Sequence, residues 1–241
     1  MPVRAPCDGV PQMAITVSHD ACLWHPMDRM AFYVAELCRY PVKSLAGERL
    51  SITTLAPDGV TGDRMVRVRG PEGVRTARRH YRLLGLHGGL DPNGHALING
   101  YPWDSPDALA LVRDAAGADA WLEACDGLDR FDILPLLVAT DGAVAAFGRD
   151  VRRLRPNIVL GGVDGLAERE WVETQLHIGE AFIRFDSMRS RCVMTTIDPD
   201  TLRLDSGVLR DIVDRFENKL ALNAEVTHGG TIRVGDPASF V

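Results

Sequence analysis

The chain has 241 residues, of which 46% are hydrophobic and 25% are charged, and its formal net charge is -6. This length allows one large domain or two small subdomains that share an interface. The negative charge argues against a nucleic-acid partner, because phosphate backbones require a clustered basic excess. The sequence has no apolar run long enough to span a bilayer, no secretory signal pattern and no CxxC pair among its five cysteines. We therefore expect a cytoplasmic protein without a membrane partner.

The first half of the chain reads as an extension followed by a β-rich part. Residues 1–30 show no sustained periodicity, and we predict a poorly ordered N-terminal extension there. Residues 31–125 predict a β-rich subdomain, with strands over 32–40, 49–55 and 65–69 and with loops around short strands over 85–102. Asp104 or Ser105 before Pro106 predicts the start of a helix that runs towards residue 124 and is broken in two at Gly117.

Residues 126–241 predict a second unit, rich in short strands. Strands are expected over 134–139, 158–160, 175–178, 181–185 and 231–234. Helices are expected over 141–147 and 208–216, the second behind a cap at Asp205 or Ser206. Many short strands, a few helices and no regular alternation of the two predict an α+β fold, with a β-barrel core and the N-terminal β-rich subdomain beside it.

Positive charge in this chain is carried almost entirely by arginine. Only Lys43 and Lys219 are lysines among 27 basic residues, and seven arginines fall between Arg64 and Arg82. Coding bias explains this preference more readily than selection does. Arginine nevertheless presents a fixed fork of donors that suits phosphate and oxyanions.

The segment from Arg189 to Pro199, with the sequence RSRCVMTTIDP, carries the strongest chemical signal. As a strand beginning near Cys192, it would place Cys192, Met194 and Thr196 on one face. Two neighbouring arginines favour the thiolate form of Cys192, which is a ligand for a soft metal or a nucleophile. The alternative is that Cys192 is a small buried hydrophobic residue, the commoner fate of a lone cysteine.

This segment and four others, in this order, match one family. The five are Tyr40-Pro41-Val42-Lys43-Ser44, Gly62-Asp63-Arg64, Arg155-Pro156-Asn157-Ile158-Val159, Arg191 to Pro199 and Gly230 to Asp236. From about Phe32 to the C-terminus the chain thus resembles the molybdenum cofactor sulfurase C-terminal (MOSC) domain family. Within it the resemblance is to the branch of the mitochondrial amidoxime reducing component and its bacterial relatives.

The resemblance implies a β-barrel that binds the molybdenum cofactor, molybdenum-molybdopterin, in a cleft against the N-terminal subdomain; no pyridoxal phosphate is expected. Cys192 would ligate molybdenum, and with Asp198 it is our catalytic candidate. The cofactor-binding candidates are Lys43, Ser44, Arg64, Arg78, Arg155, Asn157, Arg191, Thr195 and Asn223, while Asp198 and Asn157 would line or brace the pocket. The chain departs from the family where Ser187-Met188 replaces Pro-Cys and where Leu202 replaces a glycine.

The leading functional hypothesis is a molybdenum-dependent oxidoreductase that reduces an N-hydroxylated small-molecule substrate. A separate electron-donor protein is expected, because the sequence has no ferredoxin-type cysteine cluster. One alternative is a carrier of sulfur or of the cofactor that uses Cys192 without turnover. Another is a barrel that has lost the cofactor and serves as a binding module.

Overall fold

A computed structural model describes residues 32–241 and, of the segment before them, only Met1. The predicted N-terminal extension over 1–30 therefore falls outside the described residues. Among the described residues, no helix combines the length and the apolar character needed to cross a membrane.

A closed barrel of seven strands forms the core, as the sequence predicts. In order around the barrel they are β1 (Phe32–Arg39), β12 (Ile158–Gly161), β11 (Leu136–Thr140), β15 (Lys219–His228), β14 (Ala181–Ser190), β13 (Gln175–Ile178) and β17 (Pro237–Phe240), which pairs back with β1. β11 and β12 pair in parallel and the other neighbours are antiparallel. β2 (Glu48–Leu50) extends the sheet beyond β1.

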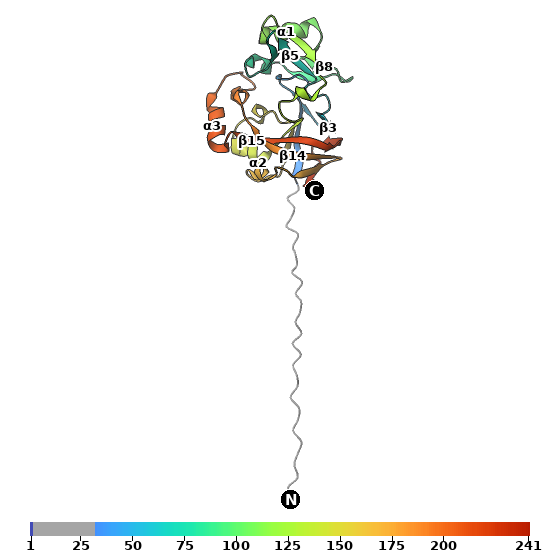
Figure 1. The fold of residues 1–241 in the computed structure, drawn as a ribbon, viewed down its shortest axis with the longest axis vertical. Coiled ribbons are helices and arrows are strands. Elements are labelled where there is room, and N and C mark those ends of the chain that lie inside the picture. Colours follow the sequence, from blue (N-terminus) through green and yellow to red (C-terminus); the bar gives the residue numbers. More distant parts are fainter. Residues whose placement is uncertain (2–31) are drawn as a thin grey trace.

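Three small sheets accompany the barrel. They comprise β10 (Trp121–Ala124), β5 (Val66–Gly70) and β6 (Gly73–Arg75); β16 (Gly230–Arg233), β3 (Ile52–Ala56) and β4 (Gly59–Val60); and β7 (Gly88–Leu90), β8 (Ala96–Ile98) and β9 (Tyr101–Pro102). β5, β8 and α1 lie together at one end of the molecule and the barrel strands β14 and β15 at the other (Figure 1). The division at 125 to 126 stays a prediction, and β1, from the N-terminal side of it, is a barrel strand.

Three α-helices begin at capping side chains. α1 (Pro106–Ala116) begins after Ser105, whose Oγ accepts a hydrogen bond from Ala108 N. α2 (Asp141–Phe147) begins after Thr140, and α3 (Ser206–Phe216) after Asp205. These caps satisfy backbone N–H groups that would otherwise lack partners, as expected for Ser, Thr and Asp. α3 packs against β15 and against the segment Val193–Thr196 that follows Cys192.

The predicted second helical piece before residue 124 is wrong. α1 ends at Ala116 with Gly117 in a positive-φ conformation, and residues Trp121–Ala124 form β10 instead. β10 pairs with β5 in register, so Glu123 faces Arg67 across the pair and forms an ion pair with it. Pairing with a distant strand has overridden the local helical pattern.

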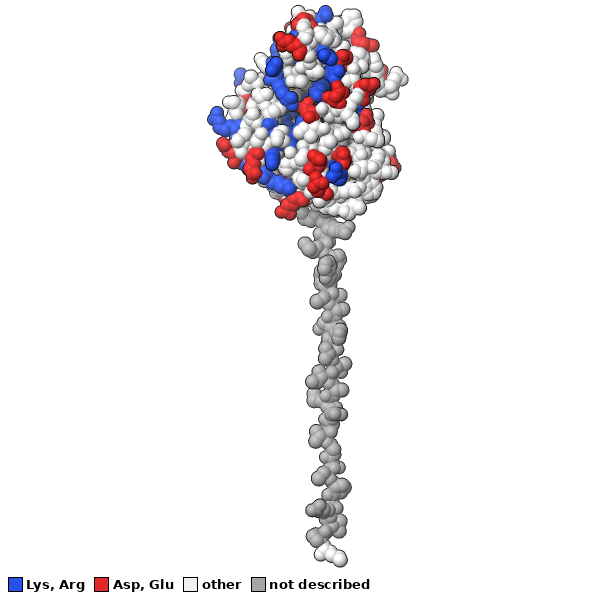
Figure 2. All heavy atoms as spheres, in the orientation of Figure 1, with Lys and Arg blue, Asp and Glu red and all other residues white. Residues whose placement is uncertain are grey.

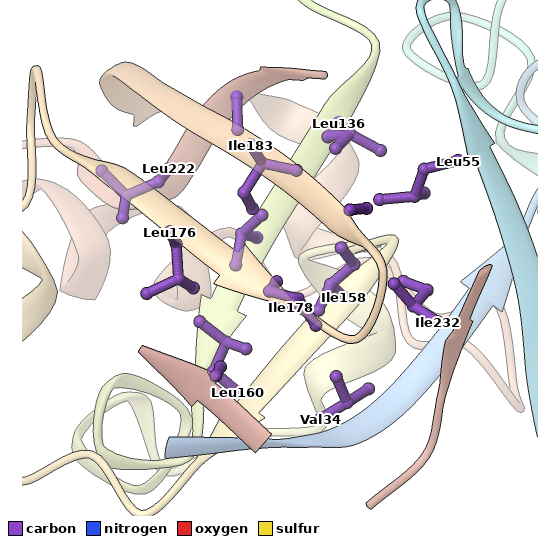
Figure 3. Close-up of a cluster of buried hydrophobic side chains, with 14 of the residues drawn as sticks. Val34, Leu55, Leu136, Ile158, Leu160, Leu176, Ile178, Ile183, Leu222 and Ile232 are labelled. Carbon is purple, nitrogen blue, oxygen red and sulfur yellow. The ribbon is translucent and has the colours of Figure 1, made fainter. Parts of the chain in front are cut away.

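The hydrophobic core fills the barrel and is built from alternate residues of its strands. Leu136 and Val138 of β11 point into this core, with Ile158 and Leu160 of β12 (Figure 3). Between them, Leu137 belongs to a smaller cluster on the other side of β11, packed against α2 residue Val144. Because both faces of β11 are covered, all five of its residues are buried.

Glu168 is a carboxylic acid buried beside the start of α2. Its Oε2 accepts a hydrogen bond from Thr140 Oγ1 (3.3 Å), while Oε1 has no partner among the described residues. Burial raises the pKa of Glu168, so the folded protein binds this proton more tightly than the unfolded chain does. The stabilisation that follows is present at acidic pH and is lost as the pH rises through the folded-state pKa.

We expect Glu168→Gln to raise the free energy of unfolding at pH 7.5 by about 1 kcal/mol, because a neutral amide replaces a poorly solvated carboxylate. The gain should shrink as the pH approaches 4.5. Urea unfolding at both pH values measures it, with the exposed neighbour Glu170→Gln as the matched control. A Glu168→Gln protein that is less stable than wild type at pH 7.5 contradicts this account.

Candidate functional site

One cavity gathers most of the candidate residues, where the N-terminal part of the chain meets the barrel. Ten of the eleven candidates line it: Lys43, Ser44, Arg64, Arg78, Arg155, Asn157, Arg191, Cys192, Thr195 and Asn223. The cavity volume is about 110 Å³, and the cavity together with its open mouth contains about 870 Å³ that protein atoms do not fill. Figure 2 shows Lys and Arg atoms gathered around a hollow between the two ends of the molecule.

Cys192 does not begin a strand, and that prediction is wrong. The residue precedes a short 3₁₀ helix over Val193–Thr196. Thr195 Oγ1 donates a hydrogen bond to Cys192 O (2.9 Å), and Thr196 Oγ1 donates to Val193 O (2.7 Å). Threonine hydroxyls that bond to a carbonyl three residues earlier compete with strand pairing and fold the backbone into a turn. The turn leaves the Cys192 thiol free, half-buried and on the cavity wall.

Three of the lining residues adopt the left-handed backbone conformation that side chains disfavour. Ser44 has φ 73°, Arg64 has φ 54° and Arg155 has φ 58°. Such conformations cost about 1 kcal/mol or more each and persist where the surrounding structure imposes them. All three residues line the same cavity. The surrounding fold therefore accepts an unfavourable backbone conformation there in order to fix the positions of these side chains.

Asp63 is a buried carboxylate that connects several residues around the cavity. It is fully buried, accepts hydrogen bonds from Tyr40 N (2.6 Å) and Asn157 Nδ2 (3.3 Å), and pairs with Arg64. Asn157 also accepts from Leu137 N (3.2 Å), so its side chain joins the barrel to the Asp63 loop. Asn157 is therefore both a lining residue and a structural tie.

Asp132 is the site residue that the sequence reasoning missed. Its carboxylate pairs with Lys43 Nζ (2.9 Å), with Arg78 Nη2 (2.7 Å) and with Arg189 Nη2 (3.4 Å). Burial alone would raise the pKa of Asp132, but the hydrogen bond and charge of Lys43 and the charges of the two arginines outweigh it, and the pKa is lowered. Asp132 is thus an ionised counter-ion that holds three cations around the cavity. In the sequence, the only sign of this role is that Asp132 is an acidic residue shortly before a predicted buried strand.

Two of the seven basic side chains of the lining lack a carboxylate partner among the described residues. They are Arg155, which stacks over the Tyr40 ring at 4.2 Å, and Arg191, which donates from Nη2 to Leu154 O (2.7 Å). Arg191 Nε and Nη1 are buried with no partner in residues 32–241. Burial, together with the charge of Arg189, lowers the pKa of Arg191 to about 10. Buried donors without acceptors indicate a place for an anion.

Arg78 and Asn223 complete the surroundings of the cysteine. The pKa of Arg78 is raised, first because its guanidinium hydrogen-bonds to the Cys192 side chain, and further by the Asp132 charge. Asn223 Oδ1 accepts a hydrogen bond from Arg189 Nη1 (3.2 Å), while its Nδ2 donates to Ser187 Oγ (3.0 Å). Ser187 is thereby part of the hydrogen-bond network behind the site.

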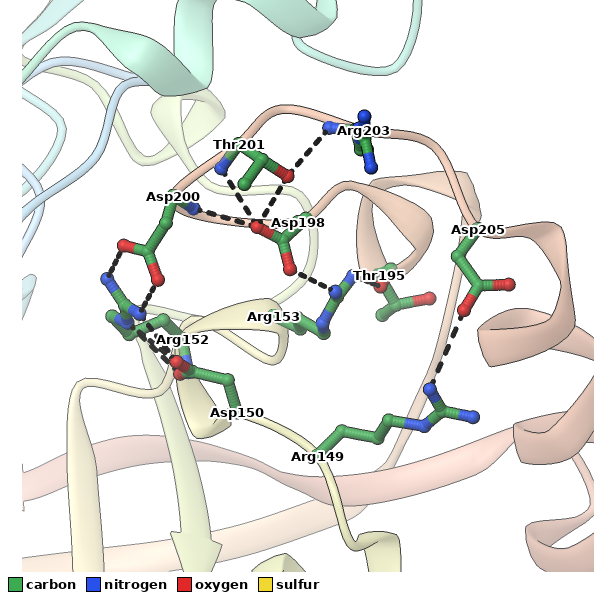
Figure 4. Close-up of polar contacts among 10 residues, drawn as sticks. All are labelled: Arg149, Asp150, Arg152, Arg153, Thr195, Asp198, Asp200, Thr201, Arg203 and Asp205. Carbon is green, nitrogen blue, oxygen red and sulfur yellow. Dashed lines mark hydrogen bonds and ion pairs between the residues drawn. The ribbon is translucent and has the colours of Figure 1, made fainter.

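Asp198 does not reach the cavity. Its Oδ2 pairs with Arg153 Nη2 (2.7 Å), and its Oδ1 accepts hydrogen bonds from Thr201 N and Oγ1. Arg153 lines the cavity and also donates to Thr195 O (3.2 Å), so Asp198 braces the wall through Arg153 (Figure 4). Leu202, in the same loop, has φ 57°, a conformation that glycine adopts freely.

The donor set fits a phosphorylated molybdenum-pterin cofactor. The cavity offers one thiol and seven basic side chains against one carboxylate, and Arg191 supplies two unpartnered donors. A soft metal takes a thiolate ligand, and phosphate and oxo groups take arginine forks. In the described part of the chain, no three His, Cys, Asp or Glu side chains are grouped to hold a metal ion.

Comparison with known proteins agrees with this geometry. The family model described as the MOSC N-terminal beta barrel domain matches residues 31–146, and the MOSC domain model matches residues 141–239. Over 125 residues, which cover 44% of its length, this chain is 33% identical to the mitochondrial amidoxime reducing component 2 of Homo sapiens. Over a stretch of the same length it is 30% identical to the human mitochondrial amidoxime-reducing component 1. The matched stretch spans little more than a third of each relative, 37% and 36%.

Solved structures show weaker similarity. The YUAD protein from Bacillus subtilis has a TM-score of 0.47 at 11% identity, covering 86% of this chain and 94% of that one. YiiM from Escherichia coli has a TM-score of 0.40 at 12% identity, covering 84% and 69%. The two family models together span residues 31–239 in the order that the sequence motifs require, and the chain therefore belongs to the MOSC domain family, with the family's N-terminal β-barrel domain.

Proposed function

We propose that this chain binds the molybdenum cofactor through Cys192 and reduces N-hydroxylated small molecules, in the cytoplasm, with electrons from a separate donor protein. One observation carries the proposal: a free, half-buried thiol lies on the wall of a cavity that holds seven basic side chains and buried donors without acceptors. The substrate class is supported by the names of the human relatives, which are amidoxime reducing components.

The chain's own residues would hold the cofactor and keep it in one orientation. Cys192 would supply the metal ligand, and Lys43, Arg64, Arg155 and Arg191 the positive charge for phosphate and pterin oxygens. When bound, the cofactor supplies the two-electron redox chemistry. Reduction of an amidoxime to an amidine takes two electrons and two protons and releases water. The half-exposed Arg78, next to the sulfur, would orient a polar substrate at the mouth.

The test is to express the full chain in a host that makes the cofactor. We expect molybdenum and pterin in equal amounts with the purified protein, and reduction of benzamidoxime by reduced viologen dye. Absence of both molybdenum and pterin overturns the proposal. Molybdenum and pterin without amidoxime reduction overturns the reductase and favours a carrier of the cofactor.

Asp198→Asn separates a catalytic role from a structural one. Because Asp198 contacts Arg153 and not the cavity, we expect amidoxime reduction to fall by less than about tenfold, together with some loss of bound molybdenum. Loss of a general acid or base costs about 10²–10⁴ in rate. A drop of that size at full molybdenum content would assign Asp198 to catalysis and contradict the bracing role.

A further inference from the structure

A second cavity lies directly behind the wall of the first. Its cavity volume is about 460 Å³, and Arg153, Arg155 and Met194 line both cavities. Cys192 lines only the first, and Cys38 only the second. The second cavity thus shares part of its wall with the first but has its own thiol, and apart from the shared residues its lining has no part in the proposed function.

The lining of the second cavity combines apolar and charged side chains, with somewhat more apolar surface than polar surface. Its apolar side chains include Leu84, Val151, Pro156, Met194, Ile197 and Leu202. They come from the N-terminal part, from the segment before β12 and from the loop beyond Cys192. Pockets of this size and composition bury the body of a small organic molecule.

The charges of the lining cancel, with one exception. Ion pairs neutralise Glu36 with Arg49 (3.3 Å), Glu48 with Arg39 (2.8 Å), Asp200 with Arg152 (2.7 Å) and Arg153 with Asp198 (2.7 Å). Arg155 has no carboxylate and no hydrogen-bond acceptor among residues 32–241. Its guanidinium lies over the face of the Tyr40 ring, 4.2 Å from the ring centroid. A partly buried cation without an ion-pair partner among the described residues favours an anionic ligand.

We propose that the second cavity binds a small organic molecule that has an apolar body and one anionic group, with the anion paired to Arg155. The apolar side chains would contact the apolar body of the ligand. Because the other charged side chains of the lining already form ion pairs, the ligand would need only one charged group. Because Met194 and Arg155 belong to both walls, such a ligand would contact the back of the cofactor site. The proposal goes beyond the proposed function and is tested on cofactor-free protein, because the proposed function also assigns Arg155 to the cofactor.

The probe for this site is 1-anilinonaphthalene-8-sulfonate, which joins an apolar body to one sulfonate. With full-length, cofactor-free protein, we expect saturable binding to one site per chain, followed by dye emission under direct excitation. N-Phenyl-1-naphthylamine, which lacks the sulfonate, should bind at least about tenfold more weakly if Arg155 supplies the charge. Equal binding of the two dyes overturns the anionic part of the proposal.

Two further measurements locate the dye. Leu202→Trp should fill the cavity and weaken dye binding at least about tenfold, whereas Leu204→Trp, at an exposed position two residues further on, should not change it. In the wild type, the dye should slow alkylation of Cys38, read by peptide mass spectrometry, and leave the rate at Cys192 unchanged. Unchanged affinity in Leu202→Trp, or unprotected Cys38, places the dye elsewhere and overturns the proposal.

Discussion

Replacing Cys192 with alanine is expected to reduce bound molybdenum to less than about a tenth of the wild-type content, because Cys192 is the only thiol among the described residues that line the cavity. Amidoxime reduction should fall in proportion. Cys192 is half-buried, and its side chain makes no hydrogen bond on which the 3₁₀ turn depends, so the fold should be retained. Metal analysis and circular dichroism on the same preparation measure the two effects.

Cys38→Ala is the matched control for this change. Cys38 is also a free, partly exposed thiol, but it lines only the second cavity. We expect its replacement to leave the molybdenum content at the wild-type value. A Cys192→Ala protein that keeps its molybdenum and turns over amidoxime contradicts the role given to this sulfur.

Arg191→Met is expected to stabilise the cofactor-free protein and to weaken cofactor binding. Arg191 Nε and Nη1 are buried without partners, and each such donor costs about 1–3 kcal/mol. The variant loses the single bond to Leu154 O, so we expect a net gain of about 1 kcal/mol in the free energy of unfolding. The pKa of Arg191, lowered to about 10, leads to the same expectation. A cation that becomes less basic on folding destabilises the folded state at every pH below that pKa.

The binding effect should run in the opposite direction. Loss of a charged donor to phosphate or pterin oxygen should weaken retention of the cofactor about tenfold or more, measured as molybdenum remaining after dialysis. Arg203→Met, on the exposed loop, is the control and should change neither quantity. If Arg191→Met destabilises the cofactor-free protein and leaves retention intact, Arg191 is a structural residue and not part of an anion site.

The positions of the barrel strands along the chain could be predicted from the sequence better than the pairing of those strands with one another. Short apolar runs such as 134–139 and 158–160 were recognisable because both faces are buried. The strand pattern predicted a barrel but not the pairings of β1 with β12 and β17 that close it, since these pairings join residues far apart in the chain. β10 was missed for the same reason, because its pairing with β5 is not visible in the local pattern.

At the site, the motifs identified the side chains but not the backbone that presents them. Ser44, Arg64 and Arg155 have left-handed backbone conformations. A glycine would have predicted such a conformation from the sequence, but none of these positions is glycine. The turn after Cys192 depends on two threonine hydroxyls, and an alternating pattern of Cys, Met and Thr resembles a strand equally well. Asp132 was missed because a single carboxylate acquires its role only when three cations converge on it.

The most direct test of the account is X-ray absorption at the molybdenum edge of the purified holoprotein and of Cys192→Ser. If the protein sulfur is a ligand, the wild type should show one more sulfur neighbour of molybdenum than the variant, in which an oxygen takes its place. Identical sulfur coordination in the two proteins would contradict the assignment of Cys192 as the metal ligand.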